Sequence, residues 1–147
     1  MNELEKETRA RLNRNTFMVH NFIEMEHVEP ERAVFRLDVR PESLNAYGMV
    51  HGGAIYTLAD NATGAVAHTD GRNYVTQTSA LHLLRNQTSG TIRANAYLRH
   101  RGRSTCLVSV DIVGEGGKLL ATGEFTFFCV DKNILDEKAK KAAAPNA

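Results

Sequence analysis

Residues 45–61 have the sequence NAYGMVHGGAIYTLADN, and two features of this stretch are unusual for a helix. Gly52 and Gly53 stand where a helical pattern of apolar residues begins, and Asp60 falls inside that pattern. A glycine costs a helix about 1 kcal/mol relative to alanine, and a buried carboxylate without a partner costs more. Both features therefore need a structural or chemical reason.

The apolar residues after Gly52 recur at helical spacing as far as Ala67, namely at positions 55, 58, 59, 62, 65 and 66. This periodicity predicts one helix over 52–67, of about four to five turns. Its side chains are small, and apolar residues lie on more than one face. We therefore expect a sheet to curve around this helix.

The segments on either side of the helix have strand character. Residues 17–28 and 32–39 resemble a hairpin around a turn at 29–31, and further strands are expected at 74–84, 90–100, 104–113 and 118–130. Residues 3–14 are expected to form a short charged helix, and the tail at 131–147 to fray. This order predicts an α+β fold in one domain over 1–147, with an antiparallel sheet wrapped around one long central helix.

Composition and charge narrow the class of protein. The chain has 147 residues, of which 42% are hydrophobic and 24% charged, as is typical of a folded, soluble domain. A net charge of +1 does not favour nucleic acid or an anionic membrane as a partner. The polar N-terminal residues contain no signal-peptide apolar region, so a cytoplasmic location is expected. Cys106 and Cys129 are isolated, and the six histidines lack metal-site spacing, so no metal is expected.

Several motifs together carry a family resemblance. NAYGMVHGGAIYTLADNATG, followed by VTQTSALHLLRN, HRGRST and GKLLATGEFTF, resembles the hotdog-fold acyl-CoA thioesterases of the phenylacetate-degradation (PaaI-type) group over about residues 45–128. The resemblance implies hydrolysis of an aromatic (phenylacetyl-type) or medium-chain acyl-CoA. It implies no cofactor, with coenzyme A present only as part of the substrate. It also implies a homodimer with shared active sites, or a dimer of such dimers.

The same resemblance implies roles for four residues, and a fifth residue is assigned from its position. The backbone N–H of Gly52 and the side chain of Asn45 would polarise the thioester carbonyl, while Asp60 would activate the attacking water with help from Thr76. The fifth is His51, whose place before the helix favours a role in orienting the loop over one in proton transfer. Physical chemistry supports the first assignment, because a helix N-terminus presents unpaired N–H groups and the positive end of the helix dipole. A preorganised donor of this kind is typically worth about 10²–10³ in rate.

The spacing of Gly52 and Asp60 carries a further inference. Asp60 follows Gly52 by eight residues, so the two lie about 12 Å apart along one helix. Reacting groups must approach within about 3–3.5 Å of each other. If both residues act on one thioester, the active site must combine two chains.

Other residues are candidates for binding the substrate. Gly53 leaves room for the thioester beside the helix, and Tyr56 is expected to form a wall of the acyl pocket. Arg99, Arg101 and Arg103 surround a turn between two strands. Their guanidinium groups suit the phosphates of coenzyme A, although an exposed basic loop would have the same sequence.

Several alternatives stay open at this stage. Asp60 could attack the thioester directly and form an anhydride instead of activating water. A non-catalytic protein that binds or senses acyl-CoA on the same fold would also share these motifs. A hotdog dehydratase is less consistent, because its expected pairing of a histidine with an acid is absent. No serine stands in a nucleophile elbow, which argues against an α/β-hydrolase.

Overall fold

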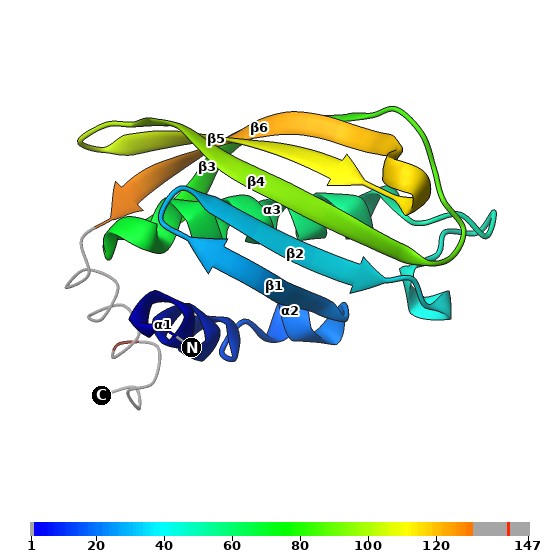
Figure 1. Ribbon diagram of the computed structural model, residues 1–147, viewed down its shortest axis with the longest axis horizontal. Coiled ribbons are helices and arrows are strands. Elements are labelled where there is room, and N and C mark those ends of the chain that lie inside the picture. Colours follow the sequence, from blue (N-terminus) through cyan, green and yellow to red (C-terminus); the bar gives the residue numbers. More distant parts are fainter. Residues whose placement is uncertain (1, 131–140, 142–147) are drawn as a thin grey trace.

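The computed structural model describes residues 2–130 and Lys141, and these residues form an antiparallel sheet around a central helix (Figure 1). Within the described residues the sheet has six strands in the order β1-β2-β4-β5-β6-β3. The strands are β1 (Ile23–Glu29), β2 (Arg32–Asp38), β3 (Asn73–Leu83), β4 (Thr91–Arg101), β5 (Thr105–Val113) and β6 (Leu119–Val130). All five neighbouring pairs are antiparallel, as predicted.

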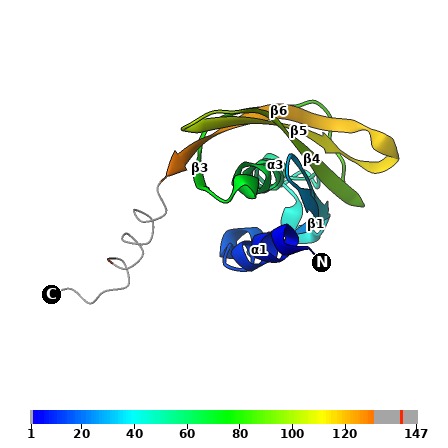
Figure 2. The same cartoon turned by 60° about the vertical axis from the view of Figure 1, so that its left-hand side comes forward.

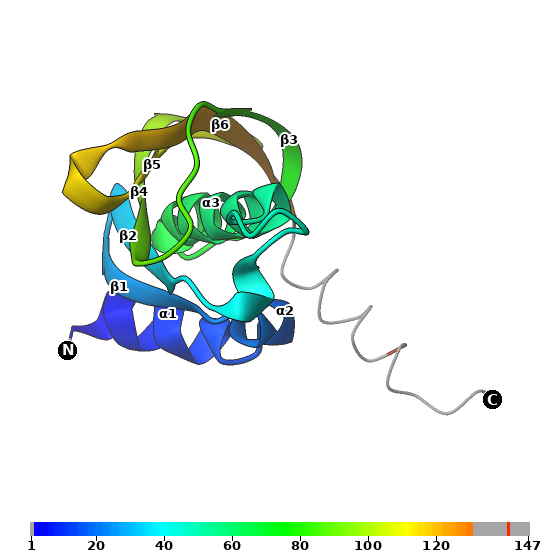
Figure 3. The same ribbon diagram turned by 90° about the vertical axis from the view of Figure 1, so that its right-hand side faces the viewer.

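The central helix α3 spans Gly52–Ala67, the range that its periodicity predicts. The sheet curves around it from β1 on one side to β3 on the other (Figure 3). The buried residues of α3 are Ile55, Leu58, Ala59, Ala62, Thr63, Ala65, Val66 and Ala67. Their small average size lets the strands approach the helix closely, so the prediction of a wrapped helix is confirmed.

The N-terminal segment contains two helices, α1 (Glu3–Leu12) and α2 (Thr16–His20). They lie beside β1 on the side of α3 that the sheet leaves open (Figures 2 and 3). The expectation of a strand beginning at residue 17 was wrong. The side chain of Asn15 caps α2 by accepting a hydrogen bond from the Met18 N–H, and Met18 itself is buried. Strand β1 begins only after Phe22, whose φ of 60° turns the chain.

Strand β3 forms one edge of the sheet and contains a bulge that matters for the site. The register with β6 shifts between Thr76 and Thr78, so the usual alternation of side chains is interrupted at Gln77. Thr76 pairs with the buried Phe127, whereas Thr78 pairs with Thr126. The bulge therefore lets Thr76 face α3 while Thr78 bonds to the Thr126 hydroxyl.

Three short 3-10 helices complete the described part of the chain: η1 (Pro41–Ser43), η2 (His68–Asp70) and η3 (Glu115–Gly117). Among the described residues, no helix is long and apolar enough to cross a membrane. The tail expected to fray at 131–147 lies outside the described residues, apart from Lys141. The single domain over 1–147 stays a prediction.

Candidate active site

The loop before α3 is held by two asparagines. Asn45 Oδ1 accepts hydrogen bonds from the backbone N–H groups of Tyr47 (2.9 Å) and Met49 (3.1 Å). Asn86, which stands where the resembling family often has a proline, accepts from the Val50 N–H at 3.1 Å and donates to the Val50 carbonyl at 3.3 Å. Because the Asn45 oxygen is used within the loop, its Nδ2 group is left as a hydrogen-bond donor.

His51 caps the N-terminus of α3. Its Nδ1 accepts a hydrogen bond from the Gly53 N–H at 2.8 Å, and its own backbone N–H donates to the Ser43 carbonyl at 2.8 Å. Among the described residues, the Gly52 N–H has no hydrogen-bond partner. Of the two glycine amides, Gly52 is therefore the one that presents a donor to a ligand, and His51 orients the turn that exposes it.

Asp60 lies near the middle of α3 and is half-buried. Its Oδ1 accepts a hydrogen bond from the Thr76 hydroxyl at 2.8 Å, across the bulge in β3. Burial raises the pKa of Asp60 above its ordinary value, and the hydrogen bond from Thr76 lowers it in part. A carboxylate with a raised pKa is a stronger base, because its charged form is less well stabilised by its surroundings.

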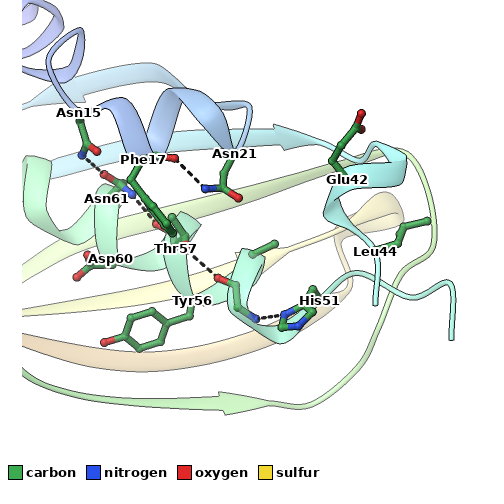
Figure 4. Close-up of a pocket in the computed structure, with 12 residues that line it drawn as sticks. Asn15, Phe17, Asn21, Glu42, Leu44, His51, Tyr56, Thr57, Asp60 and Asn61 are labelled. Carbon is green, nitrogen blue, oxygen red and sulfur yellow. Dashed lines mark hydrogen bonds between the residues drawn. The ribbon is translucent and has the colours of Figure 1, made fainter. Parts of the chain in front are cut away.

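A cleft of about 800 Å³ lies between α2, η1 and the first half of α3 (Figure 4). We call it the α2–α3 cleft, and it is lined by Asn15, Phe17, Asn21, Glu42, Leu44, His51, Gly53, Ala54, Tyr56, Thr57, Asp60 and Asn61. Asn15 Nδ2 donates to Asn61 Oδ1 at 2.8 Å, and Asn61 Nδ2 donates to the Thr57 carbonyl at 2.8 Å. These bonds join the N-terminal segment to the helix that carries Asp60.

The contributions of the N-terminal segment to this cleft were missed in the sequence. Residues 17–28 have the composition of a strand, so Phe17 and Asn21 were assigned to a hairpin instead of a cleft wall. Asn15 in front of an apolar run is a typical N-cap, and this signal could have indicated α2. Nothing in the local sequence indicates that Asn15 contacts Asn61.

Tyr56 is 40% exposed and lines the cleft, as its predicted place in the acyl pocket requires. Its hydroxyl is 2.8 Å from Ser79 Oγ on β3, and its ring centroid is 5.3 Å from that of Phe125. The cleft thus brings together His51, Gly53, Tyr56 and Asp60. Gly52 and Asn45 lie at the N-terminal end of α3, away from Asp60 of the same chain.

The three arginines expected to bind nucleotide phosphates lie at the other end of the molecule. Arg101 donates to the carbonyls of Ala67 (3.0 Å) and Val66 (3.2 Å) at the C-terminus of α3, and to Asp70 Oδ2 at 3.0 Å. It also donates to the hydroxyls of Tyr74 (2.9 Å) and Thr69 (3.4 Å). This guanidinium holds the end of a helix, and the structure does not bring it to the cleft of its own chain.

Arg99 and Arg103 are exposed. The guanidinium of Arg99 lies 5.8 Å from the centre of the Tyr97 ring, while the Arg103 carbonyl accepts a hydrogen bond from Arg72 at 2.6 Å. Neither lines the α2–α3 cleft. In the described residues, no cluster of three or more His, Cys, Asp or Glu side chains forms a candidate metal site.

Comparison with known proteins agrees with this geometry. The thioesterase superfamily matches residues 47–121, which contain α3, Asp60 and Thr76. The chain belongs to the thioesterase superfamily. The sequence-based assignment to this family, and with it to the thioester hydrolases, is confirmed.

This thioesterase is similar to two proteins that are named for the hydrolysis of CoA thioesters. Acyl-coenzyme A thioesterase PaaI of Escherichia coli is 31% identical over 90 residues, which span 60% of this chain and 64% of PaaI. The 1,4-dihydroxy-2-naphthoyl-CoA hydrolase of Listeria monocytogenes is 32% identical over 108 residues, covering 71% of this chain and 87% of the hydrolase. These two names support the assignment to a PaaI-type group of CoA thioesterases.

Solved structures establish the fold of the group. E. coli PaaI superimposes with a TM-score of 0.82 over 86% of this chain and 93% of its own, at 23% identity. A hypothetical thioesterase of Streptococcus pneumoniae, solved with coenzyme A, superimposes with a TM-score of 0.73 at 30% identity. That match covers 77% of this chain and 91% of the pneumococcal one. The predicted hotdog fold is therefore confirmed.

Proposed function

We propose that this thioesterase hydrolyses acyl-CoA by a water molecule that Asp60 activates. The observation that carries the proposal is the half-buried Asp60 carboxylate, which lies on the α2–α3 cleft and is held by Thr76 at 2.8 Å. Burial raises its pKa, which suits a general base. The relatives named for acyl-CoA hydrolysis, and the pneumococcal structure with coenzyme A, support CoA thioesters as the substrate class.

The proposed chemistry needs no group beyond water and these side chains. Asp60 takes a proton from water as the water oxygen bonds to the thioester carbon. The negative charge that develops on the carbonyl oxygen is met by the Gly52 N–H and by Asn45 Nδ2. The C–S bond then breaks, and the proton passes to the departing thiolate of coenzyme A. Direct attack by Asp60 would instead form an anhydride. If water then attacked the aspartyl carbonyl of that anhydride, single-turnover hydrolysis in ¹⁸O-labelled water would leave label in Asp60.

We further propose that each site combines Gly52 and Asn45 of one chain with Asp60 and Thr76 of another. The continuous helix α3 supports this, because eight residues of rise separate Gly52 from Asp60 by about 12 Å. The edge strand β3 offers a surface for the partner: Val75 is 46% exposed and Leu83 55%, and Leu84, which follows the strand, is 56% exposed.

The order of contacts along β3 favours a two-fold axis at this edge. Thr76, near one end of the strand, bonds to Asp60, while Leu83, at the other end, packs beside Gly52. A second copy related by a two-fold axis would run antiparallel, so its Gly52 end would lie beside the Asp60 end of the first. A homodimer, alone or paired into a tetramer, is thus the proposed assembly.

The finer details of binding are also proposals. Tyr56 is proposed as a wall for an aromatic (phenylacetyl-type) or medium-chain acyl group. Arg99 and Arg103 stay proposed contacts for the phosphates of coenzyme A, whereas Arg101 is a poorer candidate because its donors hold α3. The cytoplasmic location stays a prediction.

The decisive experiment measures thiol release from a panel of acyl-CoAs by the native protein and by Asp60→Asn. We expect Asp60→Asn to lower kcat by at least about 10²-fold on the best substrate. The variant should keep its thermal stability, because an amide removes the cost of a buried charge and still accepts the Thr76 hydrogen bond. A native protein that binds acyl-CoA tightly but releases no thiol would support the non-catalytic alternative instead.

A further inference from the structure

Arg11, on helix α1, is a half-buried cation without a partner among the described residues. The other half-buried arginines are all paired: Arg9 with Glu5, Arg36 with Glu26 and Asp38, and Arg72 and Arg101 with Asp70. Within residues 2–130, Arg11 makes neither an ion pair nor a side-chain hydrogen bond. Burial, with a smaller effect of Arg14, lowers its pKa below the ordinary arginine value. A partly desolvated charge without a partner is less stable than one in water, so this arrangement favours an anion as its ligand.

The position of Arg11 shows where such an anion would bind. It lines a second hollow of about 260 Å³, which we call the Arg11 pocket. The pocket is bounded by Arg11, Leu12, Asn15, Asp60, Asn61, Gly64, Ala65, His68, Tyr74, Val75, Thr76 and Phe127. Asn15, Asp60 and Asn61 also line the α2–α3 cleft, so the two hollows meet at the proposed catalytic base.

The other titratable groups of the Arg11 pocket are uncharged at neutral pH. Burial, with the nearby charge of Arg11, lowers the pKa of His68 to about 4, and His68 Nδ1 lies 2.7 Å from the Gly64 carbonyl. Burial and the hydrogen bond to Asp70 raise the pKa of Tyr74 to about 12, so its hydroxyl stays protonated. Arg11 and Asp60 are therefore the charged groups at the wall of this pocket.

We propose that Arg11 is a specificity-determining residue that selects acyl-CoA substrates whose acyl group ends in a carboxylate. This rests on the proposed function, since the thioester must lie at Asp60. Two hollows meet there, so the larger one, which Tyr56 lines, can hold the pantetheine arm and the smaller one the acyl group. In this arrangement Tyr56 would contact the arm instead of the acyl group. The smaller hollow suits a short acyl group, and its cation matches a terminal carboxylate, which a guanidinium binds through paired hydrogen bonds.

Gly64 adds room on the wall of the same pocket. A β-carbon at this position would lie 3.7 Å from Phe127 Cε1, so a larger side chain there would reduce the space between α3 and β6. Gly64 and Ala65 are small and line the same pocket as Arg11. They leave space on this face of α3 between Asp60 and His68. An acyl group entering past Asp60 would thus meet both apolar walls and the guanidinium of Arg11.

The test compares carboxylated acyl-CoAs with neutral ones of matched length. The pairs are glutaryl against pentanoyl, adipyl against hexanoyl, and 4-carboxyphenylacetyl against phenylacetyl, each corrected for spontaneous hydrolysis. We expect the ratio of kcat/KM, carboxylated to neutral, to exceed about tenfold for at least one pair in the native protein. Arg11→Gln should lower that ratio by at least about tenfold, mainly through KM, and Arg11→Lys should restore part of it.

Arg14→Gln is the matched control, because Arg14 is exposed on the same segment and does not line the Arg11 pocket. It should leave the ratio unchanged. Hydrolysis of neutral substrates with no preference for any carboxylated one would overturn the inference and leave the proposed function standing. Failure to hydrolyse any acyl-CoA would instead remove the proposed function itself.

A structural role for Arg11 is tested separately. If a carboxylate of a second subunit neutralised Arg11, Arg11→Gln would lower the melting temperature or dissociate the oligomer, and either result would count against a substrate role. Because Arg11 has no partner in the described chain, we expect Arg11→Gln to melt at or above the native temperature.

Discussion

Replacing Gly52 with proline removes one hydrogen-bond donor from the proposed site with little change elsewhere. Gly52 is the first residue of α3, where proline is well tolerated because its missing N–H has no intrahelical partner. His51, which precedes it, has φ −63° and ψ 134°, and this extended conformation is the one that a following proline favours. The backbone of the native protein is therefore already compatible with Gly52→Pro.

The expected loss of activity follows from the role of the amide. Removing one donor from an oxyanion hole typically lowers kcat by about 10²–10³-fold, equivalent to about 3–4 kcal/mol of transition-state stabilisation. The hydrogen bond from the Gly53 N–H to His51 stays in place, so the helix cap is retained. We expect kcat to fall by this factor while KM and the melting temperature change little.

Gly52→Ala is the control for the added side chain. A β-carbon at Gly52 would lie 3.2 Å from Leu83 Cδ1, the end of a flexible side chain, in either variant. Alanine keeps the N–H and proline does not. The difference in kcat between the two variants therefore measures the contribution of this hydrogen-bond donor. Thiol release should stay within about threefold of native for Gly52→Ala, since an exposed flexible contact can adjust. Equal losses in both variants would refute the oxyanion role of the Gly52 amide.

Mixing inactive chains then tests whether the site is shared. In hybrid dimers of Gly52→Pro and Asp60→Asn chains, one site carries both defects and the other carries none. Random exchange makes about half of the dimers hybrid, so about one quarter of the native activity should return. Absence of recovery, with subunit exchange demonstrated by mass spectrometry, would show that Gly52 and Asp60 do not act across two chains.

Two further predictions concern Thr76 and Arg101. Burial raises the pKa of Asp60 and Thr76 opposes this, so Thr76→Val should raise it further. Because the base acts only when ionised, the acid limb of the pH–rate profile should move to higher pH, whereas Thr76→Ser should leave it in place. Arg101→Met should lower the free energy of unfolding by about 2 kcal/mol, because it breaks a pair whose side chains are only 20% and 21% exposed. Chemical denaturation measures this loss, and an effect no larger than that of Arg99→Met, at an exposed site, would show that Arg101 does not hold α3.

Much of the fold was predictable because its signals are local. The helix from Gly52 to Ala67 follows from apolar residues at helical spacing, and its observed bounds match the prediction. The strands follow from alternating segments between glycine-rich and polar turns, with ends within about one residue of those expected for β3 to β6. The prediction of a strand over 17–28 was wrong at its start, because an apolar run of this length suits either a strand or a short helix.

The candidate site was predictable to a different extent for each residue. Gly52 and Asp60 lie on one regular helix, so their separation follows from sequence position and helical rise alone. His51 was correctly placed as the residue that precedes the helix, and the structure adds its bond to Gly53. Arg101 lies in the expected turn region, but its contacts with Ala67 and Asp70 depend on the packing of β4 against the end of α3.

The sequence by itself determined the central helix, the order of the strands along the chain and the distance between Gly52 and Asp60. These properties depend on backbone periodicity, which neighbouring residues set. Only the tertiary structure decided that a bulge at Gln77 turns Thr76 toward Asp60, and that Asn15 and Arg11 of the N-terminal segment line the same hollow as this aspartate. Such contacts join residues far apart in the chain, and they arise from how the layers pack rather than from any local pattern.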